Sequence, residues 1–133
     1  KILFSILGIL FLLQAKAQPN PSTEQFCGKV KVYSDNGYYV KAVNSGSNPW
    51  KFSFRYETVG YQVSSAAWAK YPVYTEVSRT TDEYKKVTIE PQEERNLFTA
   101  PQDPSKKTVY YIEIVEVYSC EEIKNPTYYS PRR

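Results

Sequence analysis

Neighbouring carboxylates are the residues of this chain whose types and spacing come closest to a catalytic or metal-binding pair. Glu113 and Glu116 lie three residues apart in a stretch that is predicted to be a strand. Side chains alternate between the two faces of a strand, so these two point apart unless a bulge brings them together. Together they could form a glycosidase-type pair or a calcium site. We expect solvated residues of a sheet face instead, as for the adjacent pairs Asp82-Glu83, Glu93-Glu94 and Glu121-Glu122.

The chain contains no histidine. This excludes Ser-His-Asp and Cys-His catalysis, and it removes the commonest ligand of zinc and the usual general base at neutral pH. The five glycines are scattered and form no phosphate-binding loop. We therefore expect no catalytic residue, no metal and no cofactor. A small carboxylate-based hydrolase or metal-assisted enzyme remains as an alternative.

Cys27 and Cys120 are the only cysteines, and they enclose nearly all of the predicted strands. In an exported chain, two cysteines most simply form a disulfide. Closing so long a loop stabilises the fold by roughly 4–5 kcal/mol in the chain-entropy estimate. No Cys-x-x-Cys spacing points to redox chemistry. We predict a structural disulfide that joins the first and last strands.

Residues 1–17 have the features of a secretory signal peptide. Lys1 precedes a short apolar run, which ends at Leu13 and is followed by Ala15-Lys16-Ala17. The run is shorter than the roughly 20 residues that span a bilayer. We expect cleavage after Ala17 and a secreted or periplasmic protein, with a polar lead at 18–26, one domain at 27–120 and a tail at 121–133.

The charges of the expected mature chain nearly cancel. The sequence has 17 basic and 14 acidic residues, and Lys1 and Lys16 leave with the signal peptide. A near-neutral chain lacks the basic surface that binds nucleic acids or membranes. We therefore expect a protein or glycan partner, no nucleic acid, and no membrane after signal cleavage.

Alternating side chains predict about seven strands and an all-β fold, an antiparallel β-sandwich with a closed barrel as the alternative. In the clearest strand, 50–57, large aromatic residues alternate with polar ones. Asp35-Asn36-Gly37 predicts the turn of a hairpin. Alternation is imperfect in the last strand, which indicates a bulge near Val115 or cover on both faces. The predicted strands are 29–34, 38–43, 50–57, 73–80, 83–90, 95–100 and 108–120, with a bend or bulge at Gly60 before 61–64.

Aromatic residues near a Ser/Ala-rich stretch, 64–72, are the predicted interaction site: Trp68, Tyr71 and Tyr74. Loops carry function more often than strands do, and an exposed Trp or Tyr can stack on a sugar or anchor a partner. The alternative is that Trp68 caps one end of the sandwich. In the pairs Tyr38-Tyr39, Tyr110-Tyr111 and Tyr128-Tyr129, one ring of each pair is a further surface candidate.

Two stretches, VKAVNSGSNPWKFSFRYE (40–57) and KKVTIEPQEERNLF (85–98), resemble immunoglobulin-like sandwich domains of exported bacterial proteins. In that family an Asn/Ser-rich turn precedes an aromatic strand, and a V-T-I-x-P-x-E turn precedes another strand. Gln92 stands where the family usually has glycine. The end AKAQ (15–18) is similar to cleavage sites in Bacteroidetes-type bacteria. The resemblance implies an immunoglobulin-like fold and export, and no particular function.

The expected function is a non-enzymatic interaction domain that binds a protein or glycan through loop and surface aromatics. The hydrolase is one alternative, and a structural or assembly subunit that pairs through an exposed strand edge is another. A cleft with converging carboxylates would favour the enzyme. A flat aromatic patch would favour binding, and an unprotected long edge strand would favour assembly.

Overall fold

The computed structural model describes residues 22–65, 72–103 and 107–124. These residues form seven strands and no helix, and so none long and apolar enough to cross a membrane. The strands are β1 (Thr23–Cys27), β2 (Val30–Asp35), β3 (Tyr39–Asn44), β4 (Trp50–Ser64), β5 (Val73–Ile89), β6 (Glu94–Thr99) and β7 (Thr108–Glu122).

The strands form two antiparallel sheets, which confirms the predicted all-β fold of two antiparallel layers. The first sheet has the order β1-β2-β3-β6, and the second has the order β5-β4-β7. The strands of the first sheet are 5 or 6 residues long, whereas those of the second are 15 to 17 residues long. We refer to them as the short sheet and the long sheet.

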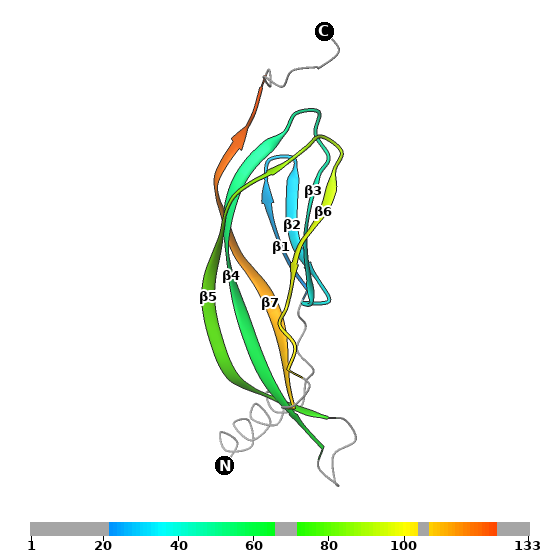
Figure 1. The fold of residues 1–133 in the computed structure, drawn as a ribbon, viewed down its shortest axis with the longest axis vertical. Helices are drawn as coiled ribbons and strands as arrows, with labels where there is room; N and C mark the ends of the chain where they lie inside the picture. The colour runs from blue at the N-terminus through cyan, green and yellow to red at the C-terminus, as the bar shows by residue number, and fades with distance from the viewer. Residues whose placement is uncertain (1–21, 66–71, 104–106, 125–133) are drawn as a thin grey trace, which may run out of the picture.

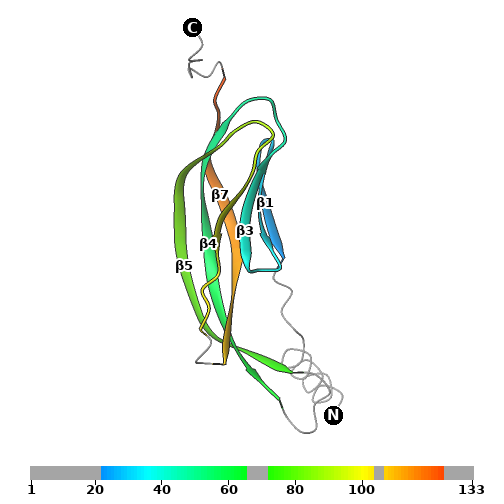
Figure 2. The same cartoon turned by 45° about the vertical axis from the view of Figure 1, so that its right-hand side comes forward.

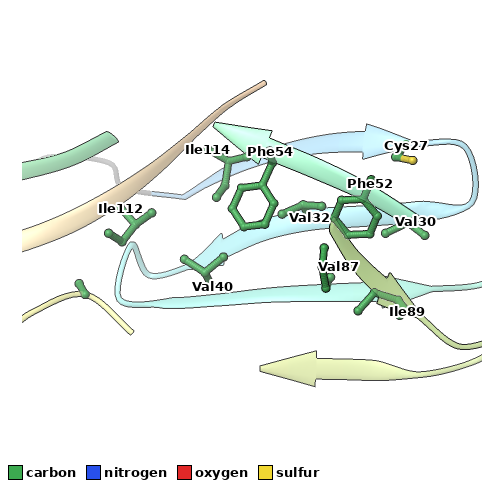
Figure 3. Packing of buried hydrophobic residues seen from close by; sticks show 12 residues of the cluster. Cys27, Val30, Val32, Val40, Phe52, Phe54, Val87, Ile89, Ile112 and Ile114 are labelled. Carbon is green, nitrogen blue, oxygen red and sulfur yellow. The ribbon is translucent and has the colours of Figure 1, made fainter. Parts of the chain in front are cut away.

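The core fills the space between the short sheet and one end of the long sheet (Figure 3). Alternate residues of β2 and β4 point inward, as their side-chain pattern predicts. Figure 3 shows the fully buried rings of Phe52 and Phe54 in this space, close to Val30 and Val32. Burying each ring contributes about 1.5–3 kcal/mol. Trp50 is only half-buried and packs against the margin of this cluster.

The two sides of the sandwich are closed by different means. On one side a disulfide joins Cys27 of β1 to Cys120 of β7, with the two Cα atoms 5.8 Å apart. This is the pairing of first and last strands that the sequence predicts, and it is compatible with an oxidising compartment. On the other side Tyr84 of β5 and Phe98 of β6 stack with 5.6 Å between ring centroids. Both rings also contact Phe54.

The long sheet extends well past the short sheet (Figures 1 and 2). In both views β4, β5 and β7 continue downward beyond the ends of β1, β2 and β3. We define the lower half of the long sheet as Thr58–Ser64 of β4 with the paired residues 73–80 and 108–112. The upper half is the remainder. The short sheet covers its Phe52 and Phe54, whereas Asp82, at the border with the lower half, is exposed.

Two local predictions from the sequence agree with the structure. Asn36 and Gly37 adopt positive φ angles of 55° and 70°, as the hairpin turn requires. Tyr56 pairs with Ile114 and Arg55 with Glu116, so Val115 is the extra residue of a bulge. The closing strand therefore changes register at the point where its alternation is imperfect.

Two predicted boundaries differ from the structure. The predicted polar lead contains β1, which makes no hydrophobic pattern: Phe26 is 63% exposed. This strand is fixed by pairing with β2, by the disulfide, and by the Ile114 amide, which donates to Thr23 Oγ1 at 2.9 Å. The predicted strands 73–80 and 83–90 form a single strand, because β4 pairs with β5 along its length.

Candidate functional site

The inner face of the lower half begins at the margin of the core, at Ile112, and carries small and hydroxyl side chains on β4 and β5. Thr58 pairs with Thr80 on one side and with Ile112 on the other, and the next inner row is Ser78, Gly60 and Tyr110. A Cβ atom on Gly60 would lie 2.4 Å from Ser78 Oγ and 2.9 Å from the Tyr110 ring. Glycine at this position therefore lets the Tyr110 ring lie against β4.

The segment Pro101–Asp103 borders this face after the chain leaves β6. The Ala100 amide donates to the Tyr38 carbonyl oxygen at 2.7 Å, and Gln102 Nε2 donates to the Tyr38 hydroxyl at 2.6 Å. Asp103 forms a bridge with Thr108 at the start of β7. The turn before β3 also reaches β7, because the Ile112 amide donates to the Gly37 carbonyl oxygen at 2.7 Å. These contacts fix the borders of a hollow in the lower half.

One part of this hollow, the tyrosine cavity, has a volume of about 630 Å³. Tyrosine and aliphatic residues make up most of its lining, and its polar residues are Gln102, Asp103, Lys107 and Thr108. Such a mixture of apolar surface with a few polar groups is typical of ligand pockets. The lining residues are Tyr38, Tyr74, Tyr110, Tyr111, Val63, Val109, Pro101, Gln102, Asp103, Lys107 and Thr108.

A second part, the polar cavity, has a volume of about 560 Å³ and meets the first at Tyr110 and the Pro101–Asp103 segment. Its other walls are the hydroxyl groups of the inner face and one carboxylate of β5. Asp82 makes no hydrogen bond or ion pair with any described residue. Within the part of the chain that the structure describes, no lysine or arginine lines this cavity, whose residues are Thr58, Ser78, Thr80, Asp82, Pro101, Gln102, Asp103 and Tyr110.

The outer face of the same strands has its charges paired. Arg79 binds Glu57, Glu76 and Glu113, with distances of 2.9 Å to Glu76 and 3.1 Å to Glu113. These hydrogen bonds, that with Glu76 foremost, raise the pKa of the Arg79 guanidinium. In return, the hydrogen bond from Arg79 lowers the pKa of the Glu76 carboxyl. The carboxylates on this face are therefore occupied by a cation of the protein itself.

The bulge at Val115 places Glu113 and Glu116 so that each meets a different arginine. Glu113 contacts Arg79, and Glu116 contacts Arg55, its neighbour on β4. The two carboxylates are thus held apart in separate ion pairs. Among the described residues, no group of three or more Asp, Glu, Cys or His side chains could hold a metal ion.

Comparison of the chain with protein-family models, with curated proteins and with solved structures finds no match. Because fold alone does not imply function, the residues of the hollow must supply the functional argument.

Of the predicted site residues, Tyr74 lines the tyrosine cavity. Trp68 and Tyr71 lie outside the described residues, and their role stays a prediction. The structure adds Tyr38, Tyr110 and Tyr111, which come from two of the tyrosine pairs that the sequence marks as surface candidates, whereas the third pair, Tyr128-Tyr129, lies outside the described residues. It also adds Asp82 and Asp103, which sequence spacing did not single out as partners because they converge only through the fold.

Proposed function

We propose that this chain is an exported, non-enzymatic binding domain that holds a glycan or protein ligand in the hollow of the long sheet. One observation carries the proposal: the tyrosine cavity and the polar cavity meet at Tyr110, on the part of the sheet that the short sheet does not cover. Sites of this kind are concave and mainly apolar, with a few polar groups that orient the ligand.

The composition of the hollow supports a binding role over incomplete packing. An exposed sheet face that awaits a second layer of its own chain would carry aliphatic side chains. The rows in the lower half instead contain Thr58, Ser78 and Thr80, which tolerate water. Tyrosine offers an apolar ring and a polar hydroxyl, and it is common at interfaces for that reason.

An immunoglobulin-like relationship and export are part of the proposal. The pairings β3–β6 and β4–β7 correspond to the B–E and C–F pairings of immunoglobulin-type sandwiches, which supports the relationship. The disulfide supports export, because such bonds persist in oxidising compartments.

The test is a binding screen against defined oligosaccharides and immobilised peptides, with the parent protein and two tyrosine variants. Tyr74→Ala removes a ring from the tyrosine cavity. Tyr33→Ala is the control, because Tyr33 lies on the short sheet, where its hydroxyl donates to Glu94. We expect Tyr74→Ala to weaken binding by about tenfold or more, since a central aromatic contact contributes at least about 1.4 kcal/mol. Equal binding by all three proteins would contradict the proposal.

A carboxylate-based glycoside hydrolase is the second candidate, because Asp82 and Asp103 line the same cavity. Such enzymes use two carboxyl groups on either side of the scissile bond. The test is the release of reducing ends from oligosaccharides by the parent protein, by Asp82→Asn and by Asp103→Asn. We expect no release from any of them. Release that both substitutions abolish would favour the hydrolase over the binding domain.

Assembly through an exposed edge has less support. β5 forms an edge of the described long sheet and is exposed over most of its length. However, its residues include Glu76, Arg79, Glu83 and Lys85, and its pairing with β4 is interrupted by two register shifts. Charges and bulges on an edge strand block the addition of another strand.

A further inference from the structure

The polar cavity is acidic, and its charge restricts the ligands that can enter it. Asp82 and Asp103 both line it, whereas no lysine or arginine of the described residues does. Lys107 lines the tyrosine cavity instead. Like charges at close range repel, so a carboxylate, sulfate or phosphate group is disfavoured in the polar cavity. Ionised carboxylates accept hydrogen bonds from hydroxyl and ammonium groups instead.

The hydroxyl groups of the inner face extend this pattern of donors and acceptors. Thr58 and Thr80 are cross-strand neighbours, and Ser78 lies one inner row further along β5. Successive inner rows are about 7 Å apart, because each residue of a strand advances the chain by about 3.3 Å. Each hydroxyl can both donate and accept a hydrogen bond. A ligand with several hydroxyl groups along its length would match this surface.

The backbone at the polar cavity argues against an extended peptide as the ligand there. Peptides that add to a sheet need an edge with unpaired amide and carbonyl groups. The inner face around Thr58 and Gly60 belongs to the central strand β4, which pairs with β5 and β7 on both sides. The hollow therefore offers rings, hydroxyls and carboxylates, and this is the chemistry that sugars use.

We propose that the ligand is a glycan of at least two units, built from neutral or amino sugars. This rests on the proposed binding function. One unit lies against the rings of Tyr74 and Tyr110 in the tyrosine cavity, and a second unit donates hydrogen bonds to Asp82 in the polar cavity. Two units are needed because the cavities meet only at Tyr110 and the Pro101–Asp103 segment, so one sugar ring cannot fill both.

The experiment measures binding of three probes by calorimetry: an oligomer of a neutral sugar, an oligomer of glucosamine, and an oligomer of a uronic acid. The parent protein is compared with Asp82→Asn. The matched control is Glu83→Gln, which removes the same charge from the next residue, on the outer face, where Glu83 accepts a hydrogen bond from Tyr118. Thermal unfolding of each variant checks that the fold is kept.

We expect the neutral or the glucosamine oligomer to bind at least about tenfold more tightly than the uronic acid oligomer. Asp82→Asn should weaken binding of the glucosamine oligomer by about tenfold or more, and so reduce the difference in affinity between the glucosamine and uronic acid oligomers. Glu83→Gln should leave the affinities for both oligomers unchanged. Tighter binding of the uronic acid oligomer, or a monosaccharide that binds as tightly as its oligomer, would overturn the proposal.

Other outcomes separate this proposal from the binding function beneath it. If a peptide or uronic acid ligand binds and Tyr74→Ala abolishes that binding, the glycan proposal fails and the binding function stands. If glycan binding is unchanged by Tyr74→Ala and by Asp82→Asn alike, the hollow is not the site and both proposals fail.

Discussion

The upper and lower halves of the long sheet are built from the same three strands and differ in their inner faces. In the upper half the inner side chains are Phe52 and Phe54, which the short sheet covers completely. In the lower half they are Thr58 and Gly60, which face a hollow. The same three strands cross the boundary, so the two halves differ in their inner side chains and in the cover that the short sheet provides. The upper half holds the fold together, and the lower half is free to hold a ligand.

The outer face shows no such division. Arg55 and Glu116 form an ion pair on the upper half, and Arg79 gathers three carboxylates on the lower half. Exposed ion pairs of this kind contribute about 0–1 kcal/mol each. They neutralise charge along both halves alike. We therefore expect inner-face substitutions in the upper half to change mainly stability, and those in the lower half to change mainly binding.

The largest effect should come from the disulfide, which fastens the upper half. Replacing Cys27 and Cys120 by serine should lower the free energy of unfolding by about 4–5 kcal/mol, because the bond closes a loop with a sequence separation of 93 residues. Chemical denaturation of the double variant measures this loss. Where the variant remains folded, ligand affinity should stay within a factor of about two, since neither cysteine lines the cavities. A loss below about 1 kcal/mol would show that the upper half does not depend on this bond.

Gly60→Ala should have the opposite profile, with a moderate cost to stability and a large cost to binding. The added Cβ would meet Ser78 Oγ and the Tyr110 ring, so the ring must move out of place. Overpacking of this kind costs about 1–3 kcal/mol. Binding should fall by about tenfold or more, and adding Ser78→Ala should restore part of the stability. Unchanged ligand affinity in Gly60→Ala would mean that binding does not depend on the Tyr110 ring lying against Gly60.

The upper half of the long sheet and the short sheet that packs on it could largely be predicted from the sequence, because most of the sequence patterns that predict them are local. The alternation at 50–57, the Asn36-Gly37 turn and the bulge at Val115 each follow from neighbouring residues. The disulfide could also be predicted, since two cysteines allow only one pairing. β1 could not, because its contacts come from Ile114 and Cys120, far along the chain.

The lower half could not be predicted from the sequence, because the hollow depends on tertiary contacts. Thr58, Ser78 and Thr80 look like ordinary strand residues, and no local pattern reveals that the partner sheet is shorter. Tyr38 and Tyr110 converge only because the turn at Gly37 contacts Ile112 and because Gln102 reaches Tyr38. Tyr74 was singled out for its setting beside the Ser/Ala-rich stretch. It lines the tyrosine cavity, and its binding role stays a prediction.

A third prediction concerns the turn that joins β5 to β6. Gln92 adopts a φ of 63°, where glycine is the favoured residue, and its Nε2 donates to the carbonyl oxygens of Ser45 and Gly46 at 3.1 and 2.9 Å. Gln92→Ala keeps the unfavourable φ and loses both hydrogen bonds, so it should destabilise the fold by about 1–2 kcal/mol. Gln92→Gly should lose less stability than Gln92→Ala, because glycine adopts a positive φ without steric strain. A larger loss of stability in Gln92→Gly than in Gln92→Ala would show that the positive φ at this position costs little.

The smallest expected effect is a change in how stability falls with acid, and it depends on Glu93 in the turn between β5 and β6. Its carboxylate accepts hydrogen bonds from Arg95 at 2.9 and 3.0 Å and from the Glu90 amide at 2.8 Å. The hydrogen bonds from Arg95, and then that from Glu90, lower the pKa of Glu93 below its usual 4.5. A carboxyl whose pKa is lower in the folded state stabilises the fold above its unfolded pKa. This stabilisation is lost as the pH falls through the folded pKa.

Glu93→Gln should therefore reduce stability at pH 7 by about 1 kcal/mol or less and flatten the decline of stability below pH 4.5, because the group is partly exposed and solvent screens it. Urea unfolding of the parent and the variant between pH 3 and 7 measures both changes. Glu121→Gln is the control, because Glu121 is exposed and makes no hydrogen bond or ion pair with the described residues. The acid decline should be the same in Glu121→Gln as in the parent. If the stability of Glu93→Gln instead declines more steeply with acid than that of the parent, protonation of Glu93 does not cause the parent's loss of stability. The ion pair of Glu93 with Arg95 then contributes as little as those on the outer face.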